Sequence, residues 1–487
     1  MTPARIAVID IGKTNAKLAL VEAETLAEIA VVTRPNRVLP GPPWPHFDLE
    51  GHWQFFLHHL ADFHGRHGVD AISVTTHGAS AVLLDGRGQA LPMLDYEHPG
   101  PDALAGAYDA IRPDFAQTGS PRLPMGLNLG AQLHWLLSDL DVAGRVADVV
   151  TYPQYWGWRL TGERASDVTS LGCHTDLWNP WAGRFSDLVE RLGLTGRIAP
   201  ARRANEVLGG LLPDVAQATG IPAGTPVAVG IHDSNASLFA HVLGRQGAFS
   251  VVSTGTWVVA MAVGGRPGAL DPGRDVLVNV NALGAPTPSA RFMGGREFEI
   301  IRAGSAAEPS DRDRAAALDA GLMILPAVEP GSGPFRGRTM AWTRPPAGDG
   351  QRMAALSWYL ALMTDSCLRL VGAQGPVIVE GPFARNGDFL DMLAALRGEG
   401  VETATSATGT SVGAARLWPH VTVLATDQSA VAVASTLATA RANRVADRVR
   451  AVRDDALATW PDGTEECVLL NPPFHDGNAV DPSVAHR

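Results

Sequence analysis

The sequence predicts an α/β protein made of two similar halves, and three observations support this. Apolar strand runs alternate with helical stretches along most of the chain. A strand, a polar turn and a second strand open the chain, and the same arrangement recurs near residue 250. With 487 residues the chain also exceeds what one hydrophobic core supports. We expect domains at residues 1–245 and 246–460, followed by a C-terminal tail at 461–487.

The first half begins with three strand runs that indicate a β-meander. They cover Ile6–Asp10, Lys17–Glu22 and Glu28–Thr33, and the turn Gly12–Asn15 joins the first two. Strands and helices then alternate, with strands expected at Ala71–Thr75 and Ala81–Leu84 and helices at Gly51–Arg66, Leu129–Asp139 and Gln154–Leu160. The strand Val227–Gly230 and a helix over Asp233–Leu243 close this half.

The second half repeats the opening design. Ala248–Ser253 and Trp257–Val263 are expected as strands on either side of the turn Thr254–Thr256. They are followed by a helix at Gln351–Val371, a strand at Pro376–Val379, a loop at Gly381–Asn386 and helices at Gly387–Arg397 and Ser411–Trp418. Residues Gln428–Trp460 have helical spacing and are expected to pack back on the body, whereas the polar tail after Leu470 is expected to be irregular.

Composition and charge indicate a soluble globular protein. The net charge is −11 and Lys and Arg do not cluster, so neither nucleic acid nor a membrane is expected as a partner. The three cysteines lie far apart, which excludes a disulfide framework and a CxxC zinc site and fits a reducing compartment. The first residues do not resemble a secretory leader and no run of 18 apolar residues occurs, so a cytoplasmic location is expected.

Phosphoryl transfer needs donors around the phosphates, a carboxylate that places Mg²⁺, and a base or orienting group on the attacking hydroxyl. Asp10 ends a buried strand, and the turn Gly12–Asn15 follows it with several donors. The turn Thr254–Thr256 offers the same kind of donors in the second half. Each segment alone is equally compatible with an ordinary hairpin turn, in which these residue types are favoured.

Two further segments carry candidate chemistry. Asp233 stands where a strand gives way to a helix, so it is either a base for a substrate hydroxyl or a helix N-cap. Its spacing does not separate these alternatives. The loop Gly381–Asn386 follows an apolar strand, where α/β folds bind nucleotides, although a plain strand-to-helix connection has the same appearance.

In this order and spacing, the four segments resemble the FGGY carbohydrate kinases of the actin/Hsp70/hexokinase-like superfamily. The resemblance covers about residues 4–420 and includes the stretches Leu160–Glu163 and Gly321–Pro326. Thr408–Ala415 is similar to the family's closing Gly-Ala-Ala helix. The resemblance implies two ribonuclease-H-like domains with the active site in the cleft between them, sugar bound mainly by the first domain, and ATP and Mg²⁺ as cofactors.

The resemblance also assigns roles to individual residues. Asp233 matches the catalytic base, and Asp10 matches the residue that helps hold the metal. The implied phosphate-binding residues are Gly12, Lys13, Thr14, Asn15, Thr254, Gly255 and Thr256, and the implied nucleotide-binding residues are Gly381, Ala384, Arg385 and Asn386. The implied substrate-binding residues are His77, Gly78, Ser80, Asp95, Gln154, His232 and Asp233. Lys13 departs from the family's usual Thr or Ala, and Pro382 stands where a second glycine is usual.

Three segments narrow the substrate within the family. Thr76–Gly78, His232-Asp233 and Ser253–Trp257 are similar to the L-rhamnulose and L-fuculose kinases rather than to the xylulose or glycerol kinases. They imply a 6-deoxyketohexose as the acceptor. Ser80 replaces an Asp that is expected to bind a sugar hydroxyl, so a pentulose of the xylulose or ribulose type is the alternative.

A protein of another class would share the two phosphate turns, namely a non-catalytic nucleotide-binding sensor of the actin-like superfamily. Asp233 together with a sugar pocket separates the two hypotheses. The expected partners are a small sugar and ATP, and the sequence leaves open whether the chain forms a homodimer.

Overall fold

The structure is a computed structural model that describes residues 3–243, 245, 247–398, 400–404, 409–418, 423–427, 429–442 and 449–453. These residues form two compact units. The main unit comprises residues 5–22 and 26–417, and the C-terminal unit comprises residues from 418 onward with two short N-terminal pieces. Within the described residues, every helix is too short or too polar to span a bilayer.

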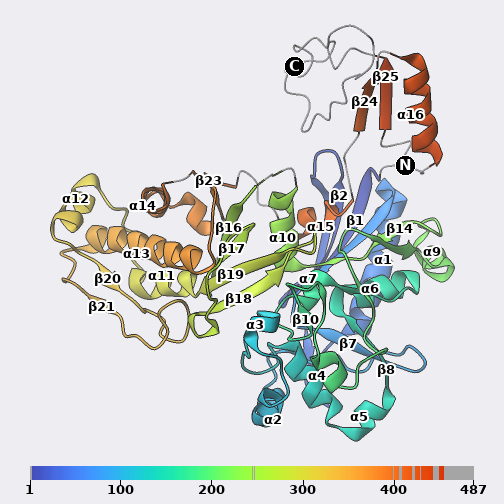
Figure 1. Cartoon of the computed structure of the whole chain (residues 1–487), viewed down its shortest axis with the longest axis horizontal. Helices are drawn as coiled ribbons and strands as arrows, with labels where there is room; N and C mark the ends of the chain where they lie inside the picture. Colours follow the sequence, from blue (N-terminus) through green and yellow to red (C-terminus); the bar gives the residue numbers. More distant parts are fainter. Residues whose placement is uncertain are drawn as a thin grey trace, which may run out of the picture. The chain divides into compact units, whose positions relative to one another are not determined.

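The first sheet of the main unit has seven strands, with β15 paired to β6 beside the path β13-β14-β6-β1-β2-β3 (Figure 1). The strands are β1 (Arg5–Ile11), β2 (Asn15–Glu22), β3 (Glu28–Pro35), β6 (Ala71–Thr76), β13 (Val207–Gly210), β14 (Pro226–Ala228) and β15 (Ile231–His232). The predicted meander β1–β2–β3 is antiparallel, and β6 lies parallel to β1. Both β1 and β6 are buried almost throughout, as expected for strands covered on both faces.

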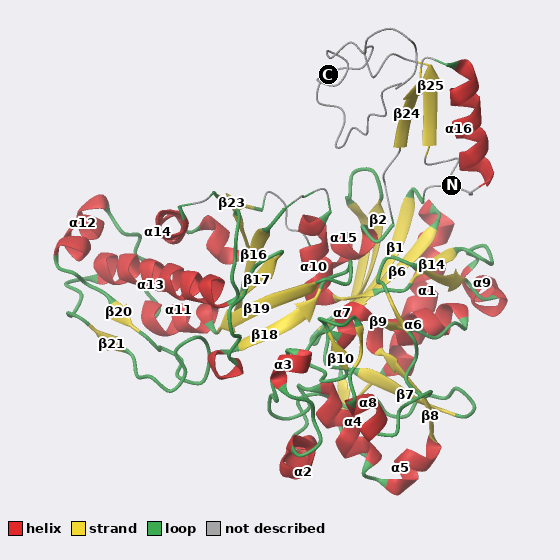
Figure 2. Ribbon diagram, in the orientation of Figure 1, coloured by secondary structure: helices red, strands yellow, loops and turns green. Residues whose placement is uncertain are grey.

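The second sheet repeats this topology. It has six strands in the order β18-β19-β17-β16-β22-β23. They are β16 (Phe249–Thr254), β17 (Val258–Val263), β18 (Val276–Val280), β19 (Pro286–Phe292), β22 (Val377–Glu380) and β23 (Val401–Thr403). The strands β16, β17 and β19 are antiparallel, whereas β22 and β23 run parallel to β16. This is the path of β1, β2, β3, β6 and β14, so the predicted duplicated α/β fold is confirmed (Figure 2).

Each sheet has its own hydrophobic core and its own long helix. In α1 (Leu49–His67), the side chains of Trp53, Phe56, Leu60 and Phe63 form the buried stripe of an amphipathic helix in the first core. The helix α13 (Asp349–Leu370) contributes Leu356, Leu360, Met363 and Cys367 to the second core. A single hydrophobic core stops growing beyond about 250–300 residues, so separate cores are expected in a chain of this length.

The remaining helices include most of those predicted. They are α2 (Ala105–Asp109), α3 (Phe115–Thr118), α4 (Leu129–Leu137), α5 (Leu140–Arg145), α6 (Tyr152–Thr161), α7 (Val168–Leu171), α8 (Leu188–Arg191), α9 (Pro213–Thr219), α10 (Asp233–Val242), α11 (Gly294–Arg302), α12 (Asp311–Asp319), α14 (Gly387–Arg397) and α15 (Thr410–Ala415). Short strand pairs connect them: β4 (Val38–Leu39) with β5 (His46–Phe47), β7 (Ala81–Asp85) with β8 (Val146–Thr151), β9 (Ser166–Asp167) with β12 (Ala201–Arg202), β10 (Trp178–Asn179) with β11 (Arg184–Phe185), and β20 (Ile324–Leu325) with β21 (Ala341–Trp342).

The C-terminal unit differs from the sequence expectation. Residues 428–460 were predicted to be helical, but α16 covers Ala430–Ala442 and Val449–Arg453 forms β25. The strand β25 pairs in parallel with β24 (Val423–Asp427), and α16 is the connection that parallel strands require. The main unit ends at Leu417, inside the range 246–460 expected for the second domain. The predicted tail at 461–487 lies outside the described residues.

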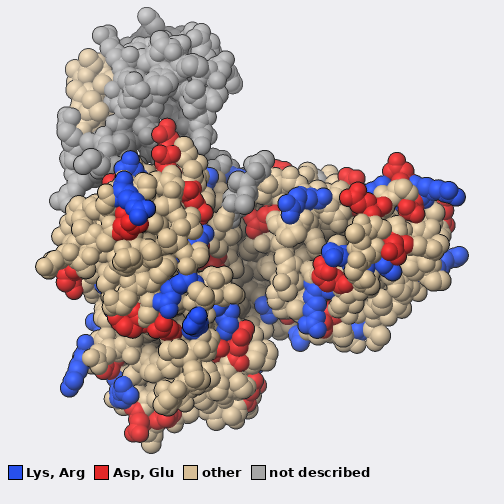
Figure 3. Space-filling view, turned by 180° about the vertical axis from the view of Figure 1, so that it is seen from behind, with Lys and Arg blue, Asp and Glu red and all other residues tan. Residues whose placement is uncertain are grey.

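Charged side chains of both signs are interspersed on the surface. Figure 3 shows Lys and Arg mixed with Asp and Glu among uncharged residues on one face of the molecule. Several form ion pairs, such as Arg202 with Glu206 at 2.9 Å and Arg245 with Glu402 at 2.7 Å. Exposed pairs of this kind contribute little to stability, so the free energy of folding comes mainly from the buried hydrophobic cores.

Two helices of the main unit, α10 and α15, pack unusually closely. The helix α15 belongs to the second half of the sequence, yet it packs on β1, β6 and α10 of the first half. A Cβ atom on Gly413 would lie 1.9 Å from the carbonyl oxygen of Ala236 in α10. The two backbones therefore approach at a distance that only glycine allows.

The contact predicts a large effect of a small substitution. Gly413→Ala should lower the free energy of unfolding by about 1–3 kcal/mol, because the added methyl group overpacks a backbone contact. Gly65→Ala is the matched control: Gly65 lies in α1 with no neighbouring atom within 4 Å of its would-be Cβ. That control should be stabilising by about 0.5–1 kcal/mol. Urea unfolding measures both, and equal effects would contradict the close packing.

Candidate active site

The turn after β1 is fixed by a side chain from outside the motif. Asn36 donates its side-chain amide to the Gly12 carbonyl at 2.8 Å and its backbone N–H to the Thr14 carbonyl at 2.9 Å. His52 lies 2.8 Å from Asn36 Oδ1. Burial lowers the pKa of His52 to about 4, so a neutral ring holds Asn36 in place. The sequence patterns missed both residues, because each is far from the turn and common as a surface residue.

Asp10 lies at the end of β1 and is buried. Its Oδ2 accepts a hydrogen bond from Ser411 Oγ at 2.7 Å and another from Thr410 Oγ1, both on α15. Lys17 Nζ lies 3.5 Å from the same oxygen. The hydroxyls of α15 thus orient the carboxylate that the sequence predicted to hold the metal.

The donor set at Asp10 fits Mg²⁺. Magnesium prefers oxygen ligands and is usually held by one or two carboxylates together with water and substrate phosphates. The described residues contain no cluster of three or more His, Cys, Asp or Glu side chains that could cage a metal ion. Asp10 beside a phosphate-type turn therefore suits a metal ion that is shared with a bound nucleotide.

Asp233 is the first residue of α10, and the N-cap position belongs to His232. The Asp233 Oδ1 accepts a hydrogen bond from the Ser234 N–H at 2.6 Å and lies 3.1 Å from His232 Nε2. His232 Nε2 is in turn 3.8 Å from Cys173 Sγ, which is 3.3 Å from His174 Nε2. Asp233 is therefore the outer member of a chain of ionisable groups.

These groups shift one another's pKa values. Burial alone would raise the pKa of Asp233, but the neighbouring His232 cation lowers it below the usual range. Burial likewise opposes the charge on His232, but Cys173 and Asp233 raise the pKa of the ring well above its usual value. The pKa of Cys173 falls to about 5, because His174 and His232 outweigh its burial. At neutral pH, Asp233 is therefore an ionised carboxylate that is able to accept a proton.

His77 lies directly beyond β6, among aromatic rings. Its ring centroid is 5.2 Å from those of Phe47 and Tyr96 and 5.0 Å from that of Tyr152. Burial lowers the pKa of His77 to about 4, and Nδ1 donates to the Gly78 carbonyl at 3.1 Å. Among the described residues, Nε2 is buried without a hydrogen-bond partner. A neutral ring in this tautomer offers Nε2 as an acceptor for a ligand hydroxyl.

The loop after β6 also lies against His232 and Cys173. A Cβ atom on Gly78 would lie 2.6 Å from His232 Nε2 and 3.3 Å from Cys173 Sγ, so glycine permits this approach. Ser80 Oγ lies 3.4 Å from His77 Nδ1. The predicted residues His77, Gly78 and Ser80 thus lie on the loop that contacts His232, and His232 contacts Asp233.

The predicted residues Lys13, Asp95 and Gln154 have surroundings that the sequence did not indicate. The Lys13 ammonium pairs with Asp95 and, at 3.1 Å, with Glu97. Gln154 is fully buried, receives a hydrogen bond from Thr151, and donates to the Val229 carbonyl at 2.9 Å. Its amide is therefore used inside the first half. Tyr96 was not predicted at all, since a lone tyrosine in a loop gives no sequence signal.

The turn Thr254–Thr256 and the predicted nucleotide-binding loop Gly381–Asn386 meet at Gly381. Thr254 Oγ1 donates to the Glu380 carbonyl at 2.6 Å and accepts from the Phe383 N–H at 3.1 Å. Gly381 has a φ of 83°, and a Cβ atom there would lie 2.0 Å from the Thr254 carbonyl oxygen. Only glycine allows both features. The exposed residues Gly255 and Thr256 complete the turn.

The predicted loop Gly381–Asn386 contains one turn of 3₁₀ helix, Pro382–Arg385, which includes Ala384 and Arg385. Asn386 caps α14 by accepting a hydrogen bond from the Phe389 N–H at 3.1 Å. Its side-chain amide donates to Ser357 Oγ at 3.0 Å. The side chain of Asn386 therefore serves the helix, whereas Ala384 and Arg385 remain candidates for contact with a nucleotide.

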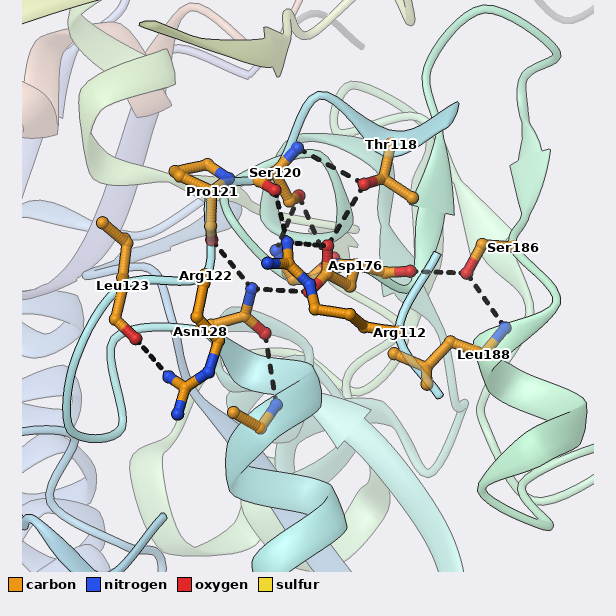
Figure 4. A network of polar contacts seen from close by, with 12 residues as sticks. Arg112, Thr118, Ser120, Pro121, Arg122, Leu123, Asn128, Asp176, Ser186 and Leu188 are labelled. Carbon is orange, nitrogen blue, oxygen red and sulfur yellow. Dashed lines mark hydrogen bonds and ion pairs between the residues drawn. The ribbon is translucent and has the colours of Figure 1, made fainter. Parts of the chain in front are cut away.

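A buried network of hydrogen bonds surrounds the carboxylate of Asp176. Asp176 accepts hydrogen bonds from Tyr108 at 2.7 Å, Asn128 at 2.9 Å, Arg112 at 3.0 Å and Thr118 at 3.1 Å. Figure 4 shows Arg112, Thr118 and Asn128 around the carboxylate. A fully buried carboxylate needs such partners, because an unpaired buried charge is costly. The network fixes residues 118–128 against residues 174–176.

A cavity of about 740 Å³ opens beside this network and is lined by both halves of the main unit. Arg122 lines it from the first half, and Trp257, directly after the turn Thr254–Thr256, lines it from the second half. Leu127, another lining residue, accepts a hydrogen bond from His174 at 3.0 Å. None of the predicted site residues, all of which are described, lines this cavity. The cavity is therefore separate from the cluster of predicted active-site residues.

Two sheets share one topology, and in each a polar turn joins the first two antiparallel strands. This arrangement is a fold of the actin/hexokinase-like ATPase type. The model of the N-terminal domain of the FGGY family of carbohydrate kinases matches residues 109–240, and the C-terminal domain model matches residues 246–428. A carbohydrate kinase from Novosphingobium aromaticivorans has a TM-score of 0.79 and 39% identity, over 84% of this chain and 93% of that one. The chain belongs to the FGGY family of carbohydrate kinases.

Curated relatives carry two different substrate names. An L-fuculokinase from Salmonella typhi is 28% identical over 271 residues, which are 54% of this chain and 57% of the relative. A xylulose kinase from Escherichia coli K12 is 27% identical over 265 residues, which are 51% of this chain and 54% of the relative. The chain thus spans about half the length of the curated kinases that it matches.

The C-terminal residues resemble a different family. The model of the methyltransferase small domain matches residues 400–487. Ribosomal RNA large subunit methyltransferase G from Streptomyces coelicolor is 46% identical over 79 residues, which are 16% of this chain and 20% of the relative. The matches to the two families overlap at residues 400–428. Within this overlap, α15 packs in the main unit, whereas β24 lies in the C-terminal unit.

The chain of ionisable groups predicts coupled titrations. Because the Cys173 thiolate raises the pKa of His232, Cys173→Ser should lower that pKa while His77 stays neutral at pH 7. NMR titration of the histidine ring signals measures both values. Cys367→Ser is the matched control, since Cys367 is equally buried but lies in the second core. An unchanged His232 titration in Cys173→Ser would show that the thiol carries no charge.

Proposed function

We propose that the chain is an ATP- and Mg²⁺-dependent kinase that transfers the γ-phosphoryl group to a hydroxyl of a small neutral sugar. One observation carries the proposal: Asp233 and the unpartnered Nε2 of His77 belong to contacting segments of the same unit as the turn of Asp10. A nucleotide sensor needs the phosphate turns but has no use for an ionised base beside an unpartnered acceptor. Family membership and the second phosphate turn agree with this proposal.

The proposed mechanism gives each group one task. Asp233 accepts the proton of the attacking hydroxyl, and His232 keeps its carboxylate ionised until then. His77 accepts a hydrogen bond from a second hydroxyl and so orients the sugar. The turns at Gly12–Asn15 and Thr254–Thr256 donate N–H and hydroxyl groups to the phosphates. When bound, Mg²⁺ neutralises phosphate charge, and Asp10 would hold it.

The charges around the proposed sugar site favour a neutral acceptor. Besides burial, the carboxylates of Asp95, Glu97 and Asp233 all raise the pKa of Tyr96, and they outnumber the cations beside them. Lys13 pairs with the first two, and the His232 ring pairs with Asp233. His77 is neutral because burial lowers its pKa to about 4. A sugar acid would bring a further negative charge into an already acidic site, which is unfavourable.

Within the neutral sugars, we favour a 6-deoxyketohexose such as L-rhamnulose or L-fuculose, which would yield a ketose 1-phosphate. The similarity to an L-fuculokinase supports this choice. Ser80 beside His77, together with the similarity to a xylulose kinase, favours a pentulose as the second candidate. A methyl-binding pocket discriminates by only about 1–3 kcal/mol, so both kinds of sugar should turn over to some extent.

The proposed base is tested by Asp233→Asn. The variant should keep its fold and its affinity for ATP but lose about 10²–10⁴-fold in kcat, which is the usual contribution of a general base. Coupled detection of ADP measures kcat, and calorimetry measures ATP binding. If the folded variant keeps near-wild-type turnover, Asp233 serves only the start of α10.

The acceptor is tested with a sugar panel under one set of conditions. We expect kcat/KM to be highest for L-fuculose or L-rhamnulose, lower for D-xylulose, L-xylulose, D-ribulose and L-ribulose, and negligible for D-gluconate. A pentulose that wins by more than about tenfold would overturn the 6-deoxyketohexose preference but leave the kinase proposal intact. Turnover of D-gluconate as the best substrate would contradict the charge argument. Absence of phosphorylation for every sugar would contradict the proposed function itself.

A further inference from the structure

The chain contains two lysines among its 39 Lys and Arg residues, and they are Lys13 and Lys17. Lys13 lies in the turn that joins β1 to β2, and Lys17 is the third residue of β2. All the other residues of that set are arginines. The planar guanidinium of arginine differs from the compact ammonium of lysine, which has three N–H donors. The use of lysine at this turn therefore points to a need for an ammonium group there.

The two lysines face different partners. Lys17 Nζ lies 3.5 Å from Asp10 Oδ2 and 3.1 Å from Glu28 Oε1, which places it beside the metal carboxylate. Lys13 Nζ instead pairs with Asp95 and Glu97, more than eighty residues away in the sequence. Asn36 fixes the turn between them through the carbonyls of Gly12 and Thr14.

The surroundings of Lys13 belong to the proposed sugar site. Its Nζ lies 4.5 Å from the ring centroid of Tyr96 and 5.2 Å from that of Phe47. Both rings contact His77, whose Nε2 is buried and unpartnered among the described residues. The pKa of Tyr96 is raised by burial and then by the charges of Glu97, Asp233 and Asp95, so the phenol is a neutral donor near the base.

We propose that Lys13, although it stands in the first phosphate turn, is a specificity residue of the sugar pocket. Its ammonium pairs with Asp95 and Glu97 through two of its three donors and offers the third to a sugar hydroxyl. The matching ligand is a neutral sugar with adjacent hydroxyls, one donating to Asp95 and one accepting from Lys13. This inference rests on the proposed kinase function and adds a residue that reads the acceptor.

An arginine would not replace this lysine. A guanidinium prefers to bind one carboxylate through two parallel N–H bonds, and its planar group is larger than the space of a point-like ammonium between two rings. Lys13→Arg keeps the charge but changes the geometry, whereas Lys13→Met keeps the length of the stem and removes the charge. The two variants therefore separate charge from shape.

Steady-state kinetics give the first test. In Lys13→Met, KM for the best sugar should rise about 10–100-fold, as for loss of a hydrogen bond to a charged group, while KM for ATP changes less than about twofold. Lys13→Arg should not restore the sugar KM. A raised KM for ATP with an unchanged sugar KM would overturn the inference and leave the kinase function standing. A wild-type chain that phosphorylates no sugar would overturn both.

Chemical labelling of the wild-type chain gives the second test and does not depend on a variant folding. With two lysines in the chain, an amine-selective acylating reagent followed by mass spectrometry reports each site separately. The best sugar alone should slow labelling of Lys13 and leave Lys17 unchanged. Protection of Lys13 by Mg²⁺ with an ATP analogue, and not by sugar, would assign it to the phosphates and overturn the inference.

Discussion

The contact between α10 and α15 is the constraint on which the candidate site depends. Gly413 allows the backbone of α15 to lie against the carbonyl of Ala236, so a helix from the second half of the sequence packs on the first sheet. From this position Ser411 binds Asp10, while α10 begins with Asp233. The proposed metal carboxylate and the proposed base are therefore held by one helix pair. A change in this packing would move both groups at once.

Electrostatics determine what each group can do there. His77 and Asp233 are neighbours, but burial leaves the imidazole neutral while His232 keeps the carboxylate ionised. His77 can then accept a hydrogen bond, whereas Asp233 can accept a proton. Their different surroundings thus give the two groups different tasks. Lys13 balances part of the negative charge of Asp95 and Glu97. The resulting site is acidic overall, which suits a neutral acceptor and a magnesium-bound nucleotide.

The sequence predicted what local patterns encode and missed what packing decides. The strand and turn pattern predicted the opening hairpin of each sheet together with β6 and β22, but not β18, β19 or β23. It also placed Asp10 and Asp233, because each stands near the end of a strand. The roles of Asn36 and Tyr96 come from contacts across long sequence separations, which no local pattern reveals. The direction of the Lys13 side chain is likewise set by residues far away in the sequence, namely Asp95 and Glu97.

The C-terminal unit was missed for another reason. The helical spacing of residues 428–460 is equally compatible with the end of a kinase domain. The similarity to a methyltransferase covers about one fifth of that relative. The main unit ends at Leu417, within the overlap of the two family matches, so α15 is the last element of the kinase-type fold in the structure.

The most direct test of this account is a crystal structure of the chain with Mg²⁺, a non-hydrolysable ATP analogue and the sugar that turns over best. The account predicts that the acceptor hydroxyl lies within about 2.6–3.2 Å of the Asp233 carboxylate, with the metal ion bound at Asp10. A sugar bound away from Asp233 and His77, or a metal ion held without Asp10, would contradict it.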